Sequence, residues 1–286
     1  MDRNEKIALI GPGVMAEALI AGMLRQELTV PDQILAAGPG LERGKELRDR
    51  YGIQTFTDNA EAARQANVVF LSVKPQKLDR VLAGLNGKIQ AHALVMSIVA
   101  GATIQKISQG LNHSMIVRAM PNTPAQIGEG ITMWTASSAV SPEQADLARE
   151  ILCSLGEEVY VEEESYLDMA TALSGTGPAY VFLFLEAMID SGVHLGLPRR
   201  ISEKLVVQTF RGSLDFYARN KIHPATLRNQ VTSPGGTSAA AIYYLEKAGF
   251  RTAISRAVWA AFERSQELGK GGASHVPERP ENNDKG

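Results

Sequence analysis

A chain of 286 residues with 44% hydrophobic and 21% charged residues has the composition of a globular protein with one large or two medium domains. Its formal net charge of −2 lacks the basic excess typical of nucleic-acid-binding proteins, so no nucleic-acid partner is expected. A single cysteine, Cys153, excludes an intrachain disulfide and a cysteine-based metal cluster, and we expect no metal site.

The N-terminus and the apolar runs favour a cytoplasmic protein. The first residues, Met-Asp-Arg-Asn-Glu-Lys, contain no apolar core of a signal peptide. The longest unbroken apolar run, around residues 179–185, is too short to span a bilayer. We therefore expect no membrane partner.

The chain begins with a strand, a glycine turn and a helix. Residues 6–10 are almost wholly apolar, which suits a strand buried on both faces, and Gly11 and Gly13 precede the helix-forming stretch 14–23. This order is similar to the dinucleotide-binding fingerprint, with Ala16 at the third glycine position. A Gly-x-Gly pair alone also occurs in turns that bind nothing. The strand–helix alternation that follows favours a dinucleotide site.

The second predicted strand, residues 33–37, has no acid at its end. A carboxylate there would bind the adenosine ribose hydroxyls, but the sequence continues as Gly-Pro-Gly, with Arg43 a few residues on. Two interpretations of Arg43 stay open. It is a phosphate partner, which would favour NADP, or a solvated residue in the first turn of a helix predicted over residues 41–51.

Strands and helices alternate over the first half of the chain, which predicts a doubly wound, mostly parallel α/β sheet. Further strands are predicted over residues 54–56, 67–73, 93–99, 115–118, 130–137 and 157–161. Further helices are predicted over residues 60–66 and 142–154, and another ends over residues 81–85. Predicted helix caps are Asp58, within the capping stretch 57–59, Thr103 and Ser141. The predicted strand ends lead into candidate site loops at Gly11, Lys74, Ala100 and Pro121. The loop at residues 121–124 is too rich in proline for regular structure.

From Glu164 the strand pattern ends. Helices are predicted over residues 164–173, 178–195, 199–220, 224–230, 237–247 and 250–268. We expect a dinucleotide-binding domain over residues 1–163, a helical substrate and dimerisation domain over 164–268, and a disordered tail over 269–286. The helices over 178–195 and 201–217 carry apolar residues on most faces, which indicates burial within the domain and against a partner subunit.

Two stretches of the helical half place small residues and a proline at a helix start, residues 174–180 and 233–238. Helix capping by Ser and Thr is the common explanation of such a stretch. Residues 233–238 also offer free backbone N–H groups and hydroxyls at a helix N-terminus, which suits a carboxylate.

Six short motifs follow one another along the chain in a specific order. They are Gly11-Pro-Gly-Val-Met-Ala, Ser72-Val-Lys-Pro-Gln, Arg118-Ala-Met-Pro-Asn-Thr-Pro, Ser174-Gly-Thr-Gly-Pro-Ala-Tyr, Leu195-Gly-Leu-Pro-Arg and Val231-Thr-Ser-Pro-Gly-Gly-Thr-Ser. Together they resemble the pyrroline-5-carboxylate reductase family from residue 6 to about residue 268. The resemblance implies a Rossmann-type α/β N-terminal domain and an all-α C-terminal dimerisation domain.

The resemblance also implies an activity. Members of the family are oxidoreductases that reduce the C=N bond of 1-pyrroline-5-carboxylate to L-proline, the last step of proline biosynthesis. The implied cofactor is NADPH or NADH, and the strand end without an acid favours NADPH. The implied assembly is a homodimer through the helical domain, commonly built into a decamer.

Site residues follow from the resemblance. The implied cofactor-binding residues are Gly11, Pro12, Gly13, Val14, Met15 and Ala16 in the diphosphate loop, Asn59 at the ribose, and Ser72, Val73, Lys74, Pro75, Ile98, Val99 and Ala100 along the cofactor. The implied substrate-binding residues are Ser233, Gly235, Gly236, Thr237 and Ser238, with Glu164 near the substrate. Ser238 stands where the family usually has a Thr, and its retained hydroxyl is the implied catalytic group, bonded to the ring nitrogen.

Three other functions are compatible with parts of the sequence. A β-hydroxyacid dehydrogenase would need a catalytic Lys after the glycine pair, but residues 178–182 contain none. A reductase of another cyclic imino acid stays open, because pocket size is not readable from the sequence. A non-catalytic nucleotide-binding relative stays open as well, although both the cofactor loop and the substrate loop are intact.

Overall fold

The computed structural model describes residues 5–269, and the structural statements that follow concern these residues. They form two compact units. The first consists of residues 5–175 together with 261–269, and the second of residues 176–260.

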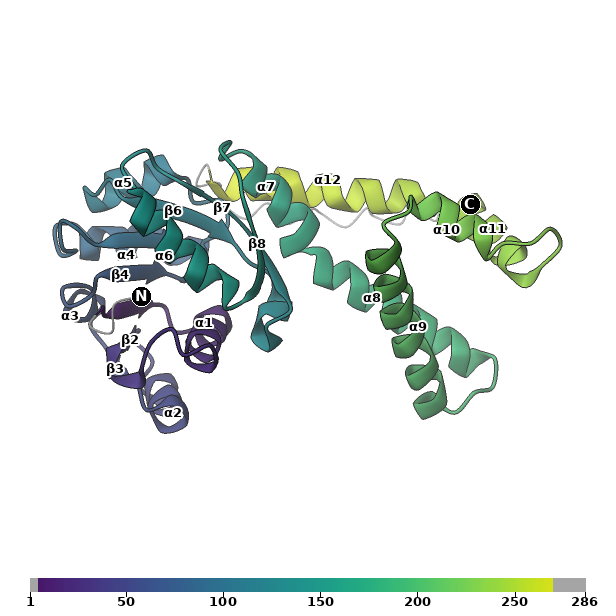
Figure 1. Cartoon of the computed structure of the whole chain (residues 1–286), viewed down its shortest axis with the longest axis horizontal. Coiled ribbons are helices and arrows are strands. Elements are labelled where there is room, and N and C mark those ends of the chain that lie inside the picture. The colour runs from purple at the N-terminus through teal and green to yellow at the C-terminus, as the bar shows by residue number, and fades with distance from the viewer. Residues whose placement is uncertain (1–4, 270–286) are drawn as a thin grey trace, which may run out of the picture. The chain divides into compact units, whose positions relative to one another are not determined.

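The first unit is built on one eight-stranded sheet with the order β3-β2-β1-β4-β5-β6-β7-β8 (Figure 1). Its strands are β1 (Ile7–Ile10), β2 (Ile34–Ala37), β3 (Gln54–Phe56), β4 (Val68–Leu71), β5 (Leu94–Ser97), β6 (Ile116–Met120), β7 (Gly130–Ala136) and β8 (Gly156–Tyr160). Neighbouring strands are parallel except β6 and β7, which are antiparallel. The order β3-β2-β1-β4-β5-β6 is that of the Rossmann fold, so the predicted fold class is confirmed.

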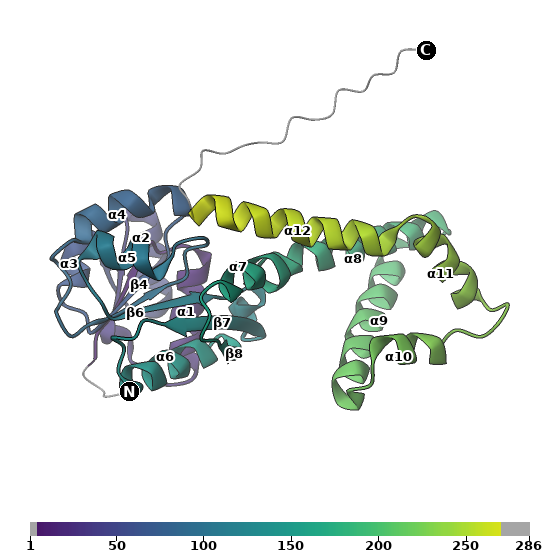
Figure 2. The same cartoon turned by 90° about the horizontal axis from the view of Figure 1, so that it is seen from above.

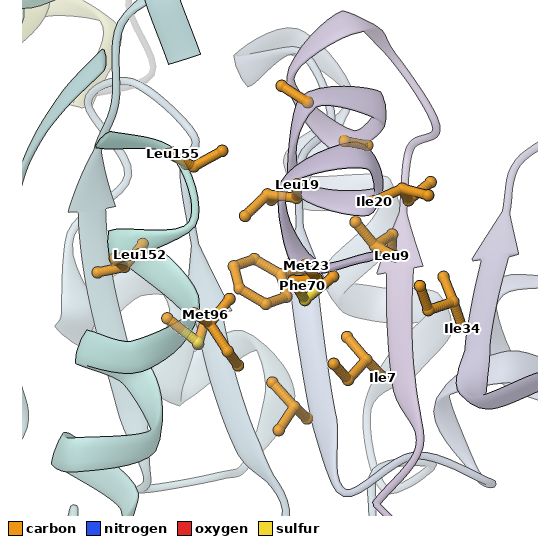
Figure 3. Packing of buried hydrophobic residues seen from close by; sticks show 14 of the residues in the cluster. Ile7, Leu9, Leu19, Ile20, Met23, Ile34, Phe70, Met96, Leu152 and Leu155 are labelled. Atoms are coloured by element: carbon orange, nitrogen blue, oxygen red, sulfur yellow. The ribbon is translucent and has the colours of Figure 1, made fainter. Parts of the chain in front are cut away.

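Helices cover both faces of this sheet. They are α1 (Val14–Arg25), α2 (Leu41–Tyr51), α3 (Asn59–Ala63), α4 (Leu78–Leu85), α5 (Ile104–Leu111), α6 (Pro142–Cys153) and α7 (Tyr166–Ala170). Ile7 and Leu9 of β1 pack in a core with α1 and α6, whereas Ala8 and Ile10 pack in a second core with α3, α4 and α5. Phe70 and its neighbours in the first of these cores are shown in Figure 3. Burial on both faces explains why β1 is apolar throughout.

Local signals in the sequence set several helix starts. The side chain of Asp58 accepts a hydrogen bond from the backbone N–H of Ala60 (2.9 Å) at the start of α3. Thr103 caps α5 through the N–H of Lys106 (3.2 Å), and Ser141 forms a capping box with α6. These predicted caps are confirmed, because each supplies an oxygen to an otherwise unpaired N–H group.

Two predictions of irregular structure are wrong. The proline-rich loop runs into a 3-10 helix, η3 (Thr123–Ile127), because a proline is compatible with the first positions of a helix. The glycines around residue 176 do not break the chain either. Residues 166–194 form one helical stretch with a bend at Thr176, since a π-helical turn, η4 (Thr171–Gly175), joins α7 to the next helix.

The second unit is helical (Figure 2). Its helices are α8 (Gly177–His194), α9 (Arg199–Asn220), α10 (Pro224–Gln230), α11 (Thr237–Lys247) and α12 (Phe250–Gly269), of which the last part belongs to the first unit. The hydroxyl of Ser202 on α9 donates to the carbonyl of Ile189 on α8 (2.8 Å). Between residues 176 and 260 only Ile189, Ser202 and Val206 are buried. The single chain therefore leaves the apolar surface of α8 and α9 largely uncovered.

The predicted domain boundary between residues 163 and 164 stays a prediction. The predicted disordered tail, residues 269–286, lies outside the described residues except for Gly269, which ends α12.

Candidate cofactor and substrate site

The turn between β1 and α1 requires glycine at one position and leaves open space at the other. Gly11 has φ +92°, and a Cβ there would lie 2.6 Å from Cγ1 of Val73. Gly13 is the N-cap residue of α1, and a Cβ there would meet nothing within 4 Å. The helix N-terminus thus faces open space, which suits a diphosphate.

Contacts from other elements hold this turn in place. The hydroxyl of Ser72 donates to the carbonyls of Gly11 (2.7 Å) and Ile10 (3.1 Å). On the other side, Nε of Arg43 donates to the carbonyl of Pro12 (2.9 Å). These hydrogen bonds fix the conformation of the turn.

A crevice of about 690 Å³ opens beside the turn, formed by the loops after β1, β2, β3 and β4 and by the first turns of α4. These loops follow the carboxyl ends of parallel strands on either side of β1, where the strand order reverses and doubly wound folds bind dinucleotides. Several residues predicted to bind the cofactor line this crevice, namely Gly11, Pro12, Gly13, Asn59, Ser72, Val73 and Lys74.

The other predicted cofactor residues lie outside the lining of this crevice. Val14, Met15 and Ala16 form the first turn of α1, and Pro75 begins the 3-10 helix η2 (Pro75–Lys77). Ile98, Val99 and Ala100 follow β5, and the N–H of Ile98 donates to the carbonyl of Leu71 at the end of β4 (3.0 Å). Their contacts with a cofactor stay predictions.

Asn59 supplies an unused acceptor at the crevice. Its Oδ1 is buried and has no hydrogen-bond partner among the described residues. Buried polar atoms are nearly always paired, so an orphaned one points to a missing partner. A ribose hydroxyl would provide the donor that this carbonyl oxygen lacks. The residues present therefore fit a dinucleotide.

The charge of the crevice is positive. Its lining includes Lys74, Lys77 and Arg80, none of which has an ion-pair partner within residues 5–269. The acid in the lining, Asp58, is occupied as the cap of α3. Sequence reasoning missed Lys77 and Arg80. Their three-residue spacing after Lys74 was the available signal, because this spacing places side chains on one helical face.

Arg43 also lines the crevice, but its guanidinium is engaged. It pairs with Glu17 of α1 and donates to Glu46 of α2 (3.1 Å), so it is not simply solvated. Burial raises the pKa of Glu17, but hydrogen bonds from Arg43, Tyr51 and Arg50 outweigh this effect and lower the pKa below its ordinary value. A role of Arg43 toward a phosphate stays a prediction.

Replacing Glu17 by Gln should lower stability at neutral pH but not in acid. A carboxylate whose pKa is lowered by folding stabilises the fold above its unfolded pKa, and this stabilisation is lost as the pH falls through the folded value. We expect E17Q to melt about 2–8 °C below the wild type at pH 7, from a loss of about 1–2 kcal/mol. Thermal unfolding at several pH values should show the difference shrinking below about pH 4. An equal difference at every pH would contradict this role of the charge.

The predicted substrate loop lies in the second unit, before α11. Gly235 has φ +73°, and the N–H of Gly236 donates to the carbonyl of Ser233 (3.0 Å), which closes a tight turn. Gly236 is the N-cap of α11, and no side chain caps this helix. The capping interpretation of Thr237 and Ser238 is therefore wrong. The Ser233, Thr237 and Ser238 hydroxyls have no hydrogen-bond partner among the described residues, so all three are free for a ligand.

Glu164, the remaining predicted substrate residue, lies in the first unit. Its Oε1 accepts a hydrogen bond from the N–H of Ile104 (2.7 Å) and pairs with Arg118 (3.0 Å). A contact between Glu164 and a substrate stays a prediction.

The sheet order, the open helix N-terminus and the cation-lined crevice place this chain in the class of Rossmann-type dinucleotide-binding proteins. Two family models match it. A model described as "NADP oxidoreductase coenzyme F420-dependent" matches residues 6–101, and one described as "Pyrroline-5-carboxylate reductase dimerisation" matches residues 164–268.

Individual relatives extend over nearly the whole chain. The pyrroline-5-carboxylate reductase of Synechocystis is 45% identical over 93% of this chain and 98% of its own length, and that of Escherichia coli is 35% identical over 93% and 99%. The crystal structure of the Plasmodium falciparum pyrroline carboxylate reductase with NADP bound has a TM-score of 0.86 at 32% identity, and the match covers 93% of this chain and 99% of that one. This chain belongs to the pyrroline-5-carboxylate reductase family.

Family membership confirms the predicted class of enzyme, an NAD(P)H-dependent oxidoreductase that forms homo-oligomers through a dimerisation domain. One helical stretch, Tyr166–His194, is also long and apolar enough to cross a membrane by length and composition, and little of it is buried within the single chain. The unbroken apolar run of residues 179–185, which the sequence prediction considered, is only part of this helical stretch. The family model for dimerisation covers this stretch, so a second copy of the chain, rather than a membrane, is a candidate to bury its apolar surface. The absence of a membrane partner stays a prediction.

Proposed function

We propose that this chain reduces 1-pyrroline-5-carboxylate to L-proline, with NADPH as the preferred donor. The observation that carries the proposal is the loop at residues 233–238. Its three free hydroxyls and the uncapped N-terminus of α11 suit a small ligand with a carboxylate and a ring nitrogen. Such a loop, in a chain of this family with an intact cofactor turn, supports the reductase rather than a non-catalytic relative.

Each part of the chain has a role in this reaction. The turn at residues 11–16 holds the diphosphate and Asn59 the ribose, while residues 74–75 and 98–100 line the nicotinamide half. The reduced nicotinamide, when bound, supplies a hydride. Ser233 and the backbone N–H groups of residues 235–238 hold the substrate carboxylate. Because a protonated imine is already a strong electrophile, the chain needs no strong acid, and Ser238 donates to or accepts from the ring nitrogen.

The test is the consumption of NADPH or NADH by the purified protein with 1-pyrroline-5-carboxylate, followed by absorbance, with proline identified by mass spectrometry. Rapid oxidation that yields proline supports the proposal. Turnover only with a six-membered cyclic imino acid would identify the alternative reductase. Protein that binds NADPH without oxidising it would identify the non-catalytic relative.

The cofactor preference rests on Lys77 and Arg80. These cations have no ion-pair partner among the described residues. They line the same crevice as the loop after β2, a strand whose end carries no acid, and would attract the additional phosphate of NADPH. Replacing both by Gln should lower kcat/KM for NADPH about 10- to 100-fold, with a much smaller effect for NADH. Lys88 lies beyond the end of α4 and outside the crevice, so K88Q is the matched control. An equal loss of kcat/KM with NADPH and with NADH would show that Lys77 and Arg80 do not bind the additional phosphate.

The assembly and the location complete the proposal. The uncovered apolar surface of α8 and α9 supports a homodimer through the helical unit, and we extend this to a decamer of five dimers. Light scattering coupled to chromatography measures the mass directly. We place the enzyme in the cytoplasm, where its single thiol, Cys153, needs no oxidising compartment.

A further inference from the structure

A buried arginine in β6 joins two carboxylates of the first unit. Arg118 is 3% exposed, and its guanidinium pairs with Glu164 (3.0 Å) and with Asp168 of α7 (2.8 Å). A buried charge is retained only when it is paired and hydrogen-bonded, so this arrangement holds both partners firmly. Each carboxylate pairs with a different nitrogen of the planar guanidinium, whereas a lysine would offer both of them a single ammonium group.

The two carboxylates extend the cluster to other segments. Glu164 Oε1 also accepts the N–H of Ile104, the first residue of α5 (2.7 Å). Asp168 Oδ1 also accepts the hydroxyl of Ser265 near the end of α12 (3.0 Å). We call Arg118, Glu164, Asp168 and Ser265 the Arg118 cluster. It connects β6, α7, α12 and the start of α5 within the first unit.

The segment that the cluster immobilises is the loop between β5 and α5, residues 98–103. Glu164 holds its end at Ile104, and the N–H of Ile98 holds its beginning on the carbonyl of Leu71 (3.0 Å). In its middle, Gly101 has φ +72°, and a Cβ there would lie 2.6 Å from the backbone nitrogen of Gly269 on α12. The loop is therefore fixed at both ends and packed against α12.

We propose that Arg118 is a positioning residue, which acts through Glu164 and Asp168 to hold residues 98–103 in the place where they meet the nicotinamide half of the cofactor. This inference rests on the proposed function, in which residues 98–100 line the cofactor. It gives Glu164 a role toward the cofactor loop instead of a contact with the substrate.

The diphosphate half of the site is held by a separate set of contacts. Ser72 and Arg43 bond the turn at residues 11–13, and neither belongs to the Arg118 cluster. Disturbing the cluster should therefore displace the nicotinamide, which is the reacting end of the cofactor. The affinity for the cofactor should stay nearly the same, because the contacts to the phosphates dominate this affinity. A small displacement of a reacting group is enough to lower the rate strongly.

The test compares four variants. R118K keeps the charge but loses the fork, and E164A removes the link to Ile104. E164Q is the conservative variant, because its amide loses the charge but keeps one acceptor oxygen, and a single oxygen of Glu164 accepts from both Ile104 and Arg118. R264K is the matched control, since Arg264 is adjacent to Ser265 on α12 but forms an exposed pair with Glu267 (2.6 Å). Each is measured for kcat and KM, for NADPH affinity by fluorescence, and for hydrogen exchange of peptides covering residues 98–106.

We expect R118K and E164A to lower kcat at least about 10-fold, with the dissociation constant of NADPH changed by less than about threefold. Hydrogen exchange of residues 98–106 should become at least about 10-fold faster in both variants. E164Q should be closer to the wild type than E164A is, both in kcat and in hydrogen exchange. R264K should match the wild type. Because exchange needs no turnover, it reports on the loop even in a variant with little activity.

Three results would overturn the proposal. Unchanged exchange in R118K and E164A would show that the cluster does not hold the loop. Faster exchange with unchanged kcat would show that the loop does not position the cofactor. If E164A raises only the KM for the imino acid, with kcat unchanged, Glu164 contacts the substrate and does not position the cofactor loop. If the wild type does not reduce pyrroline-5-carboxylate, the proposed function fails, but the positioning role can still be tested. Hydrogen exchange of residues 98–106 is then measured with and without NADPH, and the protection that NADPH gives is compared between the wild type and R118K.

Discussion

Replacing Gly13 by Val is expected to abolish NADPH binding while the fold stays intact. The backbone of Gly13 is extended (φ −80°, ψ −169°), a conformation that a β-branched residue adopts without strain. A Cβ there meets no atom within 4 Å, so the isopropyl group projects into the open space before α1. That space is the predicted diphosphate site. We expect the dissociation constant of NADPH to rise at least about 100-fold, a loss of about 2.7 kcal/mol.

Fluorescence titration with NADPH measures this affinity, and thermal unfolding without cofactor checks the fold. G13A should show a smaller loss, because a methyl group fills less of the space. G11A is the informative contrast, since its Cβ would clash with Val73 at a φ of +92°. We expect G11A to lose stability as well as binding. A G13V protein that binds NADPH like the wild type would exclude this turn as the diphosphate site.

Replacing Ser238 by Ala should reduce kcat about 100-fold without unfolding the protein. The Ser238 hydroxyl bonds no other described residue, so its removal leaves no partner unpaired. The expected loss reflects the missing hydrogen bond to the ring nitrogen in the transition state, and NADPH affinity should not change.

Two further variants separate this role from substrate binding. S238T restores a hydroxyl and the residue usual in the family, so it should retain activity. S233A removes a group assigned to the substrate carboxylate, so it should raise KM more than it lowers kcat. An unchanged kcat/KM in S238A would remove Ser238 from the mechanism.

The features that sequence reasoning predicted well are those encoded by neighbouring residues. The apolar run of β1, the glycine turn and the caps at Asp58, Thr103 and Ser141 depend on a few consecutive side chains, and the structure places each as expected. The doubly wound, mostly parallel sheet was predicted from the regular alternation of strands and helices, because such alternation is typical of βαβ units.

The features that were missed depend on distance along the chain. Arg118 and Glu164 are 46 residues apart, and nothing local to either one predicts the pair. The π-helical turn before α8 was missed for another reason, since glycines there suggest a break whenever helix propensity is considered alone. Lys77 and Arg80 were passed over because an exposed cation on a helix usually faces solvent.

The near absence of buried residues between positions 176 and 260 bears on how copies of the chain come together. A helical unit with so small a core cannot be stable by itself, so its folding and its pairing with a second copy form one equilibrium. Subunits can then exchange only as fast as this unit unfolds. The rate at which two differently labelled variants exchange partners after mixing would therefore report how fast this helical unit opens.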